Sequence, residues 1–139
     1  MNNAATIADA SAILALLKQE PFDKLDPRRL FRATISAVNL SEVLERLCSG
    51  GLSELEADEA AAALNLEVVD FDAWQARLAA YLRPQTRRAG LSLGDRACLA
   101  LGLRLGCPVV TADHESNPNP SNSAAFTTPA RCQADSIMD

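Results

Sequence analysis

The sequence predicts an α/β fold with a mainly parallel sheet. Short apolar segments alternate with longer segments of helical periodicity along most of the 139 residues, and this alternation is typical of strands joined by crossover helices. The length suits one domain with one sizeable core. Hydrophobic residues make up 48% of the chain but aromatic residues only 4%, so we expect a core of Leu, Ala and Val.

The N-terminal third contains two strand-then-helix units. Residues 6–8 form an apolar segment that leads into a helix-prone run at 12–18. Residues 33–37 contain β-branched side chains and lead into 38–47, where apolar residues recur at intervals of three and four. Between the two units we expect a further helix within residues 21–31.

The middle of the chain predicts two more helices separated by a strand. Ser53 and Glu56 have the spacing of a capping box, which opens a helix expected to continue to Leu64. Residues 66–71 then predict a strand, and Asp72 is placed to cap the helix that follows.

The remaining elements complete the alternation. A helix at 73–82 is followed by a basic connection at 84–90 and a helix from about 93 to 105. Gly106 ends this last helix, and residues 107–111 predict a short buried strand. We therefore expect a final parallel strand close to Asp113.

The sequence divides into two regions by composition. Residues 1–113 carry all of the predicted elements, whereas residues 114–139 are rich in Ser, Asn, Pro and Thr without apolar periodicity. We interpret 1–113 as one folded domain and 114–139 as an atypical, disordered or weakly ordered tail.

Charge and cysteine content exclude several classes of protein. The net charge of −5 disfavours broad nucleic-acid binding, although residues 77–104 hold six arginines against one acid. These arginines could guide a phosphate backbone, or they could simply form a solvated helix surface. The candidates for contact with phosphate are Arg87, Arg88 and Arg96. Four dispersed cysteines and one histidine disfavour a zinc site. Without a signal-like or membrane-length apolar segment, a cytoplasmic protein is expected.

Three acidic residues stand where an open parallel sheet forms its ligand site, and a fourth, Asp95, could reach the same crevice. Asp9 follows the first strand, Glu42 lies one turn into the helix after the second, Asp95 opens a helix, and Asp113 follows the last strand. Clustered carboxylates repel one another unless a cation neutralises them. Mg²⁺ and Mn²⁺ prefer such oxygen ligands and support phosphodiester hydrolysis, so these residues predict a metal-dependent hydrolase.

Each acid also has a purely structural interpretation. Glu42 lies three residues after Asn39, and Asp95 three residues after Ser92, so both could complete helix N-caps. Asp9 could cap a strand-to-helix turn, and Asp113 could be an ordinary turn residue. The arrangement at strand ends favours a shared site over four separate caps.

Four motifs resemble those of PIN-domain ribonuclease toxins, of the VapC type, from bacterial toxin–antitoxin modules. They occur in the family's order between residues 6 and 113: Asp9-Ala10-Ser11-Ala12, Ile35-Ser36-Ala37-Val38-Asn39-Leu40-Ser41-Glu42-Val43, Leu91-Ser92-Leu93-Gly94-Asp95-Arg96-Ala97 and Thr111-Ala112-Asp113.

The resemblance implies a three-layer α/β/α sandwich and endonucleolytic cleavage of structured RNA, of the transfer or ribosomal class. It also implies that Mg²⁺ or Mn²⁺ is bound by Asp9, Glu42, Asp95 and Asp113, with Ser11 and Thr111 as supporting hydroxyls. A homodimer and a cognate antitoxin protein that obstructs the site are the partners it implies. The family's closing helix and hydrophobic strand have no counterpart in residues 114–139.

Two other functions are compatible with parts of the sequence. The atypical tail is consistent with a catalytically impaired module of the same fold that only binds an antitoxin. A phosphotransfer domain would also gather acids around Mg²⁺, but such domains use a lysine late in the chain, and the only lysines here are Lys18 and Lys24. The ribonuclease is the preferred hypothesis.

Overall fold

The structure is a computed structural model, and it describes residues 6–19, 27–82 and 90–112. Several predictions fall outside these ranges. They concern the start of the helix expected at 21–31, most of the basic connection, and the C-terminal tail. They also concern three individual residues, namely Arg87, Arg88 and Asp113.

The described strands form one parallel four-stranded sheet in the order β3-β2-β1-β4. In the register of this sheet, Ile7 is paired with Thr34 on one side and with Val109 on the other. The strands are short, in agreement with the short apolar segments of the sequence. Their bounds are β1 Ile7–Ala8, β2 Thr34–Ser36, β3 Glu67–Val69 and β4 Val109–Val110.

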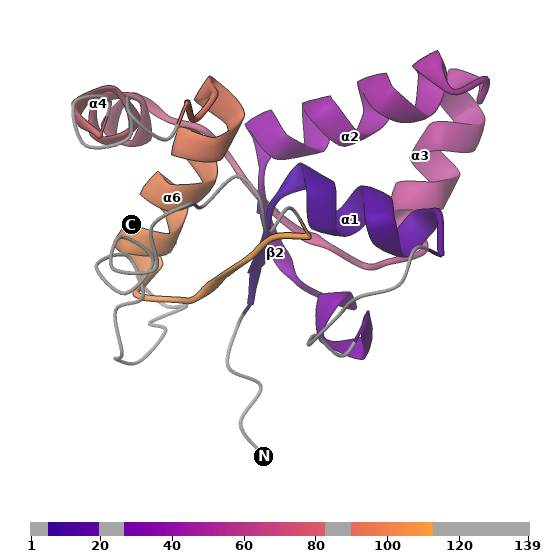
Figure 1. The fold of residues 1–139 in the computed structure, drawn as a ribbon, viewed down its shortest axis with the longest axis horizontal. Coiled ribbons are helices and arrows are strands. Elements are labelled where there is room, and N and C mark those ends of the chain that lie inside the picture. The colour runs from indigo at the N-terminus through magenta and orange to yellow at the C-terminus, as the bar shows by residue number, and fades with distance from the viewer. Residues whose placement is uncertain (1–5, 20–26, 83–89, 113–139) are drawn as a thin grey trace.

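Helices cover both faces of this sheet, which confirms the expected three-layer α/β/α fold (Figure 1). One face carries α1 (Ala10–Leu17), α2 (Ala37–Ser49) and α3 (Glu54–Ala62). The other face carries α4 (Ala73–Tyr81) and α6 (Leu93–Leu105). The crossovers therefore change face between β1 and β4, and ligand sites of open α/β sheets form at such a switch in strand order.

The segment between β1 and β2 differs from its prediction. In place of the helix expected at 21–31, its described part is one 3-10 turn, η1 (Pro27–Leu30). Pro27 has no backbone N–H and suits the first position of a turn. Arg32 takes a positive φ of 60°, which ends the turn and redirects the chain into β2. Within this turn, Leu30 is fully buried.

Apolar side chains fill the space on both sides of the sheet. On the face of α1, α2 and α3, the buried cluster includes Ile13, Leu30, Ile35 and Val43. On the face of α6, it includes Ile7, Cys98, Leu101 and Leu105. Gly102 brings α6 close to β4, since a β-carbon there would lie 2.8 Å from Val109 Cγ2 and 3.3 Å from the Cys107 carbonyl oxygen. Burial thus fixes α6, which carries one of the predicted acids, against the sheet.

The longest described helices, α2 and α6, have 13 residues each. A helix that spans a bilayer needs roughly 20 mainly apolar residues. None of the helices in the described ranges combines the length and apolarity needed to cross a membrane.

The predicted capping box of α3 is present and allows a test of local stability. The Ser53 hydroxyl accepts from the Glu56 N–H at 3.1 Å, and the Glu56 carboxylate accepts from the Ser53 N–H at 3.0 Å. Ser53→Ala is therefore expected to lower the free energy of unfolding by about 1 kcal/mol, measured by urea denaturation. Ser41→Ala, on the exposed surface of α2, should change it by less than about 0.5 kcal/mol. Equal effects would contradict the assigned cap.

Candidate active site

Asp9 lies directly after β1 and begins helix α1. Its Oδ1 accepts a hydrogen bond from the Ala12 N–H at 2.9 Å and another from the Ser11 hydroxyl at 2.8 Å. The residue is 8% exposed. The structural interpretation of Asp9 as a cap is therefore correct, but a neutral Asn or Ser could cap this helix equally well. Capping alone does not explain why a charged side chain is kept in a nearly buried position.

Glu42 is not part of a helix cap. Helix α2 begins earlier than predicted, with Ser36 as its N-cap, so that Asn39 and Glu42 are both inside the helix. Asn39 Nδ2 donates to Glu42 Oε1 at 2.9 Å and to the Gly94 carbonyl at 3.0 Å. The Asn39 side chain thereby connects α2 to the first turn of α6.

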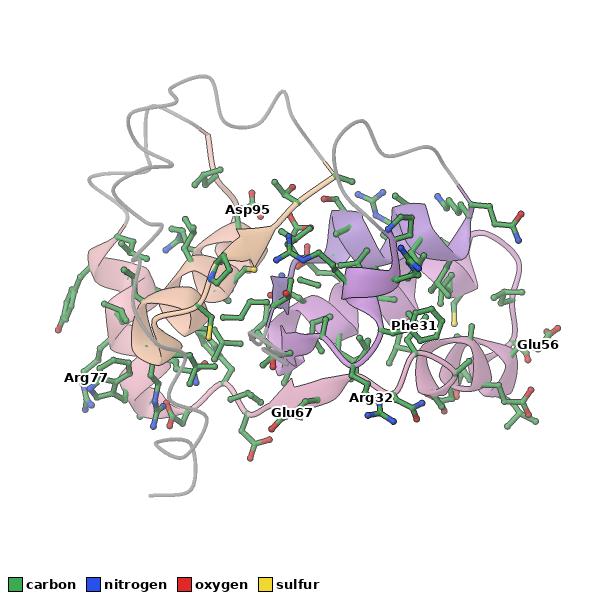
Figure 2. The ribbon with its side chains drawn as sticks, turned by 90° about the horizontal axis from the view of Figure 1, so that it is seen from below. Phe31, Arg32, Glu56, Glu67, Arg77 and Asp95 are labelled. Carbon is green, nitrogen blue, oxygen red and sulfur yellow. The ribbon has the colours of Figure 1, made fainter. Side chains whose placement is uncertain are left out.

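Asp95 is both a cap residue and part of the cleft. It accepts from the Ser92 N–H through Oδ2 at 3.0 Å, and the Ser92 hydroxyl accepts from the Asp95 N–H at 3.2 Å. These bonds form the capping box of α6. Figure 2 labels Asp95 at the start of this helix. The capping interpretation of Asp95 is correct, yet it leaves Oδ1 without a hydrogen bond from the described residues.

The three described acids line one pocket of about 220 Å³ at the carboxyl edge of the sheet. They come from three different helices, which start beyond β1, beyond β2 and after the 83–89 segment. The structure therefore brings together residues that are up to 86 positions apart (95 minus 9). The pocket is lined by Asp9, Ala10, Ser11, Leu14, Asn39, Glu42, Arg46, Ser92 and Asp95.

The two predicted supporting hydroxyls lie beside Asp9. The oxygens of Ser11 and Thr111 are 3.1 Å apart, and the Ser11 hydroxyl also accepts from the Ala112 N–H at 3.2 Å. The end of β4 is thus connected by hydrogen bonds to the first turn of α1. Ser11 and Thr111 orient Asp9 across the switch in strand order.

Burial and like charges make the ionised forms of two of these acids costly. Burial is the main cause that raises the pKa of Asp9, against hydrogen bonds from Thr111, Ala12 and Ser11 that lower it. Burial also raises the pKa of Glu42, with the Asn39 bond opposing it. The charge of Asp95 adds to both increases. An unneutralised cluster of this kind favours a bound cation.

Comparison with known proteins identifies the family. The family model described as the PIN domain matches residues 6–117, which is most of the chain. The chain belongs to the PIN-domain family. No curated protein matches it. Among the solved structures, this PIN domain is similar to the crystal structure of Mycobacterium tuberculosis VapC20, described as a sarcin-ricin loop cleaving toxin.

The similarity to that structure concerns the fold. The two structures superpose over 91% of this PIN domain and 99% of the other chain, with a TM-score of 0.64. Their sequence identity is only 18%. The shared architecture agrees with the parallel sheet and the two helical layers described above. It extends over nearly the whole length of both chains.

The described arginines of the PIN domain do not form one patch at the pocket. Arg96 donates to the Ala79 carbonyl at 3.1 Å, and Arg104 is paired with Asp72 at 2.9 Å. Figure 2 shows Arg77 well away from Asp95. Neither Arg96 nor Arg104 lines the pocket. In the described part of the arginine-rich stretch, these side chains instead contact helix α4 and the residue that caps it. An RNA-binding role for Arg96 stays a prediction.

Asn39 and Arg46 line the pocket beside Glu42 and are not among the site residues predicted from the sequence. Arg46 lies four residues after Glu42, and Asn39 lies three residues before it, so all three share one face of α2. This spacing is the sequence signal that could have placed Asn39 and Arg46 beside Glu42. Arg46 is the basic side chain among the residues that line the pocket, and its charge lowers the pKa of Glu42.

The donor chemistry of the PIN domain fits a hard divalent cation. Glu42 and Asp95 each have one oxygen that is held by a hydrogen bond and another that accepts none from the described residues. Within the described ranges, no group of three or more acidic, histidine or cysteine side chains is arranged so that it could hold a metal ion by itself. Mg²⁺ needs no such arrangement, because it keeps several waters and binds through one or two carboxylates together with substrate phosphate.

Proposed function

We propose that this PIN domain is a metal-dependent endoribonuclease and the toxin component of a toxin–antitoxin pair. The observation that carries the proposal is the convergence of Asp9, Glu42 and Asp95 in one pocket at the strand-order switch of a PIN domain. Burial of carboxylates without an equal number of basic neighbours supports a cation site. The reaction is hydrolysis of a phosphodiester bond in RNA.

In this proposal, Asp9, Glu42 and Asp95 would hold Mg²⁺ or Mn²⁺, with Asp113 as a fourth acid. When bound, such an ion supplies a water of lowered pKa and neutralises charge on the phosphodiester. Ser11 and Thr111 keep the Asp9 carboxylate oriented. Arg46, at the pocket, and the predicted Arg87, Arg88 and Arg96 would attract the phosphate backbone.

The proposed partners follow from the family and from the similar structure. VapC20 is described as a toxin that cleaves the sarcin-ricin loop, and this supports a structured ribosomal or transfer RNA as the substrate here. A cognate antitoxin protein, a homodimeric state and a cytoplasmic location complete the proposal. The acidic balance of the chain favours recognition of RNA shape at a local site over broad electrostatic binding.

Glu42→Gln provides the test of this function. The amide keeps the size of the side chain and is not needed for a helix cap, so the fold should be retained. With Mg²⁺ or Mn²⁺, wild-type protein should cleave a sarcin-ricin-loop hairpin or a transfer RNA pool, and EDTA should stop the reaction. Glu42→Gln should reduce the rate roughly a hundredfold or more, since even partners of metal ligands commonly contribute 10–100-fold.

Glu45→Gln is the matched control for this test. It makes the same chemical change on the same helix, but Glu45 is exposed and does not line the pocket. Its cleavage rate should stay within about twofold of wild type, as expected for a surface substitution. Cleavage that survives both EDTA and Glu42→Gln would disprove the metal-dependent mechanism.

A further inference from the structure

Gly94, the second residue of α6, lies directly against the Glu42 side chain. A β-carbon at Gly94 would overlap the Glu42 carboxylate, at 2.6 Å from Cδ and 2.8 Å from Oε2. Real β-carbons essentially never approach other atoms more closely than 3.0 Å. The three nearest atoms all belong to the flexible end of one side chain. Any side chain at position 94 would therefore displace this carboxylate while leaving the backbone in place.

Asn39 holds the same carboxylate by a hydrogen bond. Its Nδ2 donates to Glu42 Oε1 and to the Gly94 carbonyl, and the residue is only 1% exposed. The orientation of the amide is determined, because the reverse orientation would place Oδ1 against two acceptors. Asn39 thus contacts both Glu42 and the residue whose missing side chain makes room for it.

This orientation leaves one atom of Asn39 unsatisfied. In the described structure, the buried Oδ1 has no hydrogen-bond partner, and an unpaired buried acceptor costs free energy. The two hydrogen bonds donated by Nδ2 offset this cost. They leave Glu42 Oε2 without a donor among the described residues, on a side chain that lines the acidic pocket.

Gly102 shows how a purely structural glycine of the same helix differs. Its nearest atoms are a side chain of β4, at 2.8 Å, and the backbone carbonyl of Cys107, at 3.3 Å. A methyl group there would overlap these atoms and push α6 away from the sheet. Neither strand atoms nor backbone atoms are among the three closest to a β-carbon at Gly94, so close packing of α6 on the sheet is not the reason for glycine at that position.

We propose that Asn39 and Gly94 are positioning residues that hold the Glu42 carboxylate in one orientation in the pocket. The proposal rests on the proposed function for what the oriented carboxylate does, which is to bind a divalent cation. The arrangement itself belongs to the free protein. Asn39 supplies the hydrogen bond, and Gly94 supplies the space.

Gly94→Ala and Gly102→Ala separate positioning from packing. Thermal melting and calorimetric titration with Mn²⁺ would be measured for both variants and for wild type. Gly94→Ala should melt at or above the wild-type temperature, because Ala favours a helix over Gly. Its Mn²⁺ affinity should fall about 10–100-fold, as for other residues that orient metal ligands. Gly102→Ala should melt lower, with Mn²⁺ affinity of the folded protein unchanged.

A double-mutant cycle tests whether the effect passes through Glu42. In a Glu42→Gln background, adding Gly94→Ala or Asn39→Ala should cause little further loss of Mn²⁺ affinity, because the oriented carboxylate is already absent. Additive losses would overturn the proposal. Asn39→Ala in the wild-type background should itself lower the affinity about 10–100-fold, and it decides the question if Gly94→Ala does not fold.

A metal-free measurement separates this inference from the proposed function. A crystal structure of Gly94→Ala without metal should show the Glu42 carboxylate moved away from Asn39 Nδ2. A carboxylate that stays within hydrogen-bond distance overturns the positioning role, whatever the metal data show. A wild-type protein that neither binds Mn²⁺ nor cleaves RNA overturns the proposed function, while the displaced carboxylate would still establish the positioning.

Discussion

Asp9→Asn is expected to slow RNA cleavage strongly and also to raise the melting temperature of the metal-free protein at neutral pH. Asn is as good an N-cap as Asp, and its Oδ1 can keep the bonds from Ala12 and Ser11. The substitution therefore removes only the nearly buried charge. The cleavage rate should fall roughly a hundredfold or more, since a proposed ligand is lost. Such a gain in stability at the cost of activity is typical of functional sites.

The pH dependence of this stability difference follows from the pKa of Asp9. Burial raises that pKa in the folded protein above its unfolded value. At pH values above the pKa of Asp9 in the folded protein, the buried charge therefore lowers the stability of wild type. This loss of stability disappears as the pH falls through the folded pKa towards the pKa of the unfolded chain. The advantage of Asp9→Asn in EDTA should be largest at neutral pH and vanish in acid. A lower melting temperature for the variant at pH 7 would contradict this account.

Asp72→Asn is a control for which the expected change in melting temperature at neutral pH has the opposite sign. Asp72 is also an N-cap, of helix α4, but it is exposed, and its pKa is lowered by the Gln75 N–H and by Arg104. A lowered pKa contributes stability above the unfolded value that is lost as the pH falls through the folded one. Asp72→Asn should therefore lower the melting temperature slightly at neutral pH, and the difference from wild type should shrink in acid.

Leu101→Ala is expected to lower the free energy of unfolding by about 3 kcal/mol, within the range measured for buried leucines. Leu101 is 0% exposed and belongs to the cluster that fixes α6 to the sheet. For a domain of this size, the melting temperature should fall by about 10 °C, measured by calorimetry or circular dichroism. Because α6 carries Asp95 and Gly94, cleavage should also become more sensitive to temperature.

Leu93→Ala is the matched control for this core substitution. It removes the same atoms from the same helix, but Leu93 is 52% exposed and does not line the acidic pocket. Its free energy of unfolding should change by less than about 0.5 kcal/mol. If Leu101→Ala changed stability no more than this control, the packing of α6 against β1 and β4 would be wrong.

Much of the fold could be predicted because its signals are local. The Ser53–Glu56 capping box, the alternation of strands and helices, and the left-handed Gly106 at the end of α6 depend on residues within a few positions of one another. The helix predicted at 21–31 shows the limit. Its described part is a single 3-10 turn that buries Leu30, and only contact with α1 and the sheet determines that outcome.

The candidate site could be predicted in part for the same reason. Asp9, Glu42 and Asp95 were identified by their positions at strand ends and by the motifs around them, and the structure places all three in one pocket. The sequence could not show that Asn39 is a bridge rather than a cap, since its second acceptor, Gly94, is 55 positions away. Nor could it show that Arg96 is paired with a carbonyl of α4.

By itself, the sequence determined the order of the elements, the acidic residues that meet at the strand ends and the family motifs. These depend on periodicity, capping and residue type, which act over one or two turns of the chain. The tertiary structure alone decided the strand order β3-β2-β1-β4, the hydrogen bond from Asn39 to Glu42, and the close approach of Gly94 to the Glu42 carboxylate. Those features arise from close approach of distant segments, and the distances involved are set by packing of the whole core.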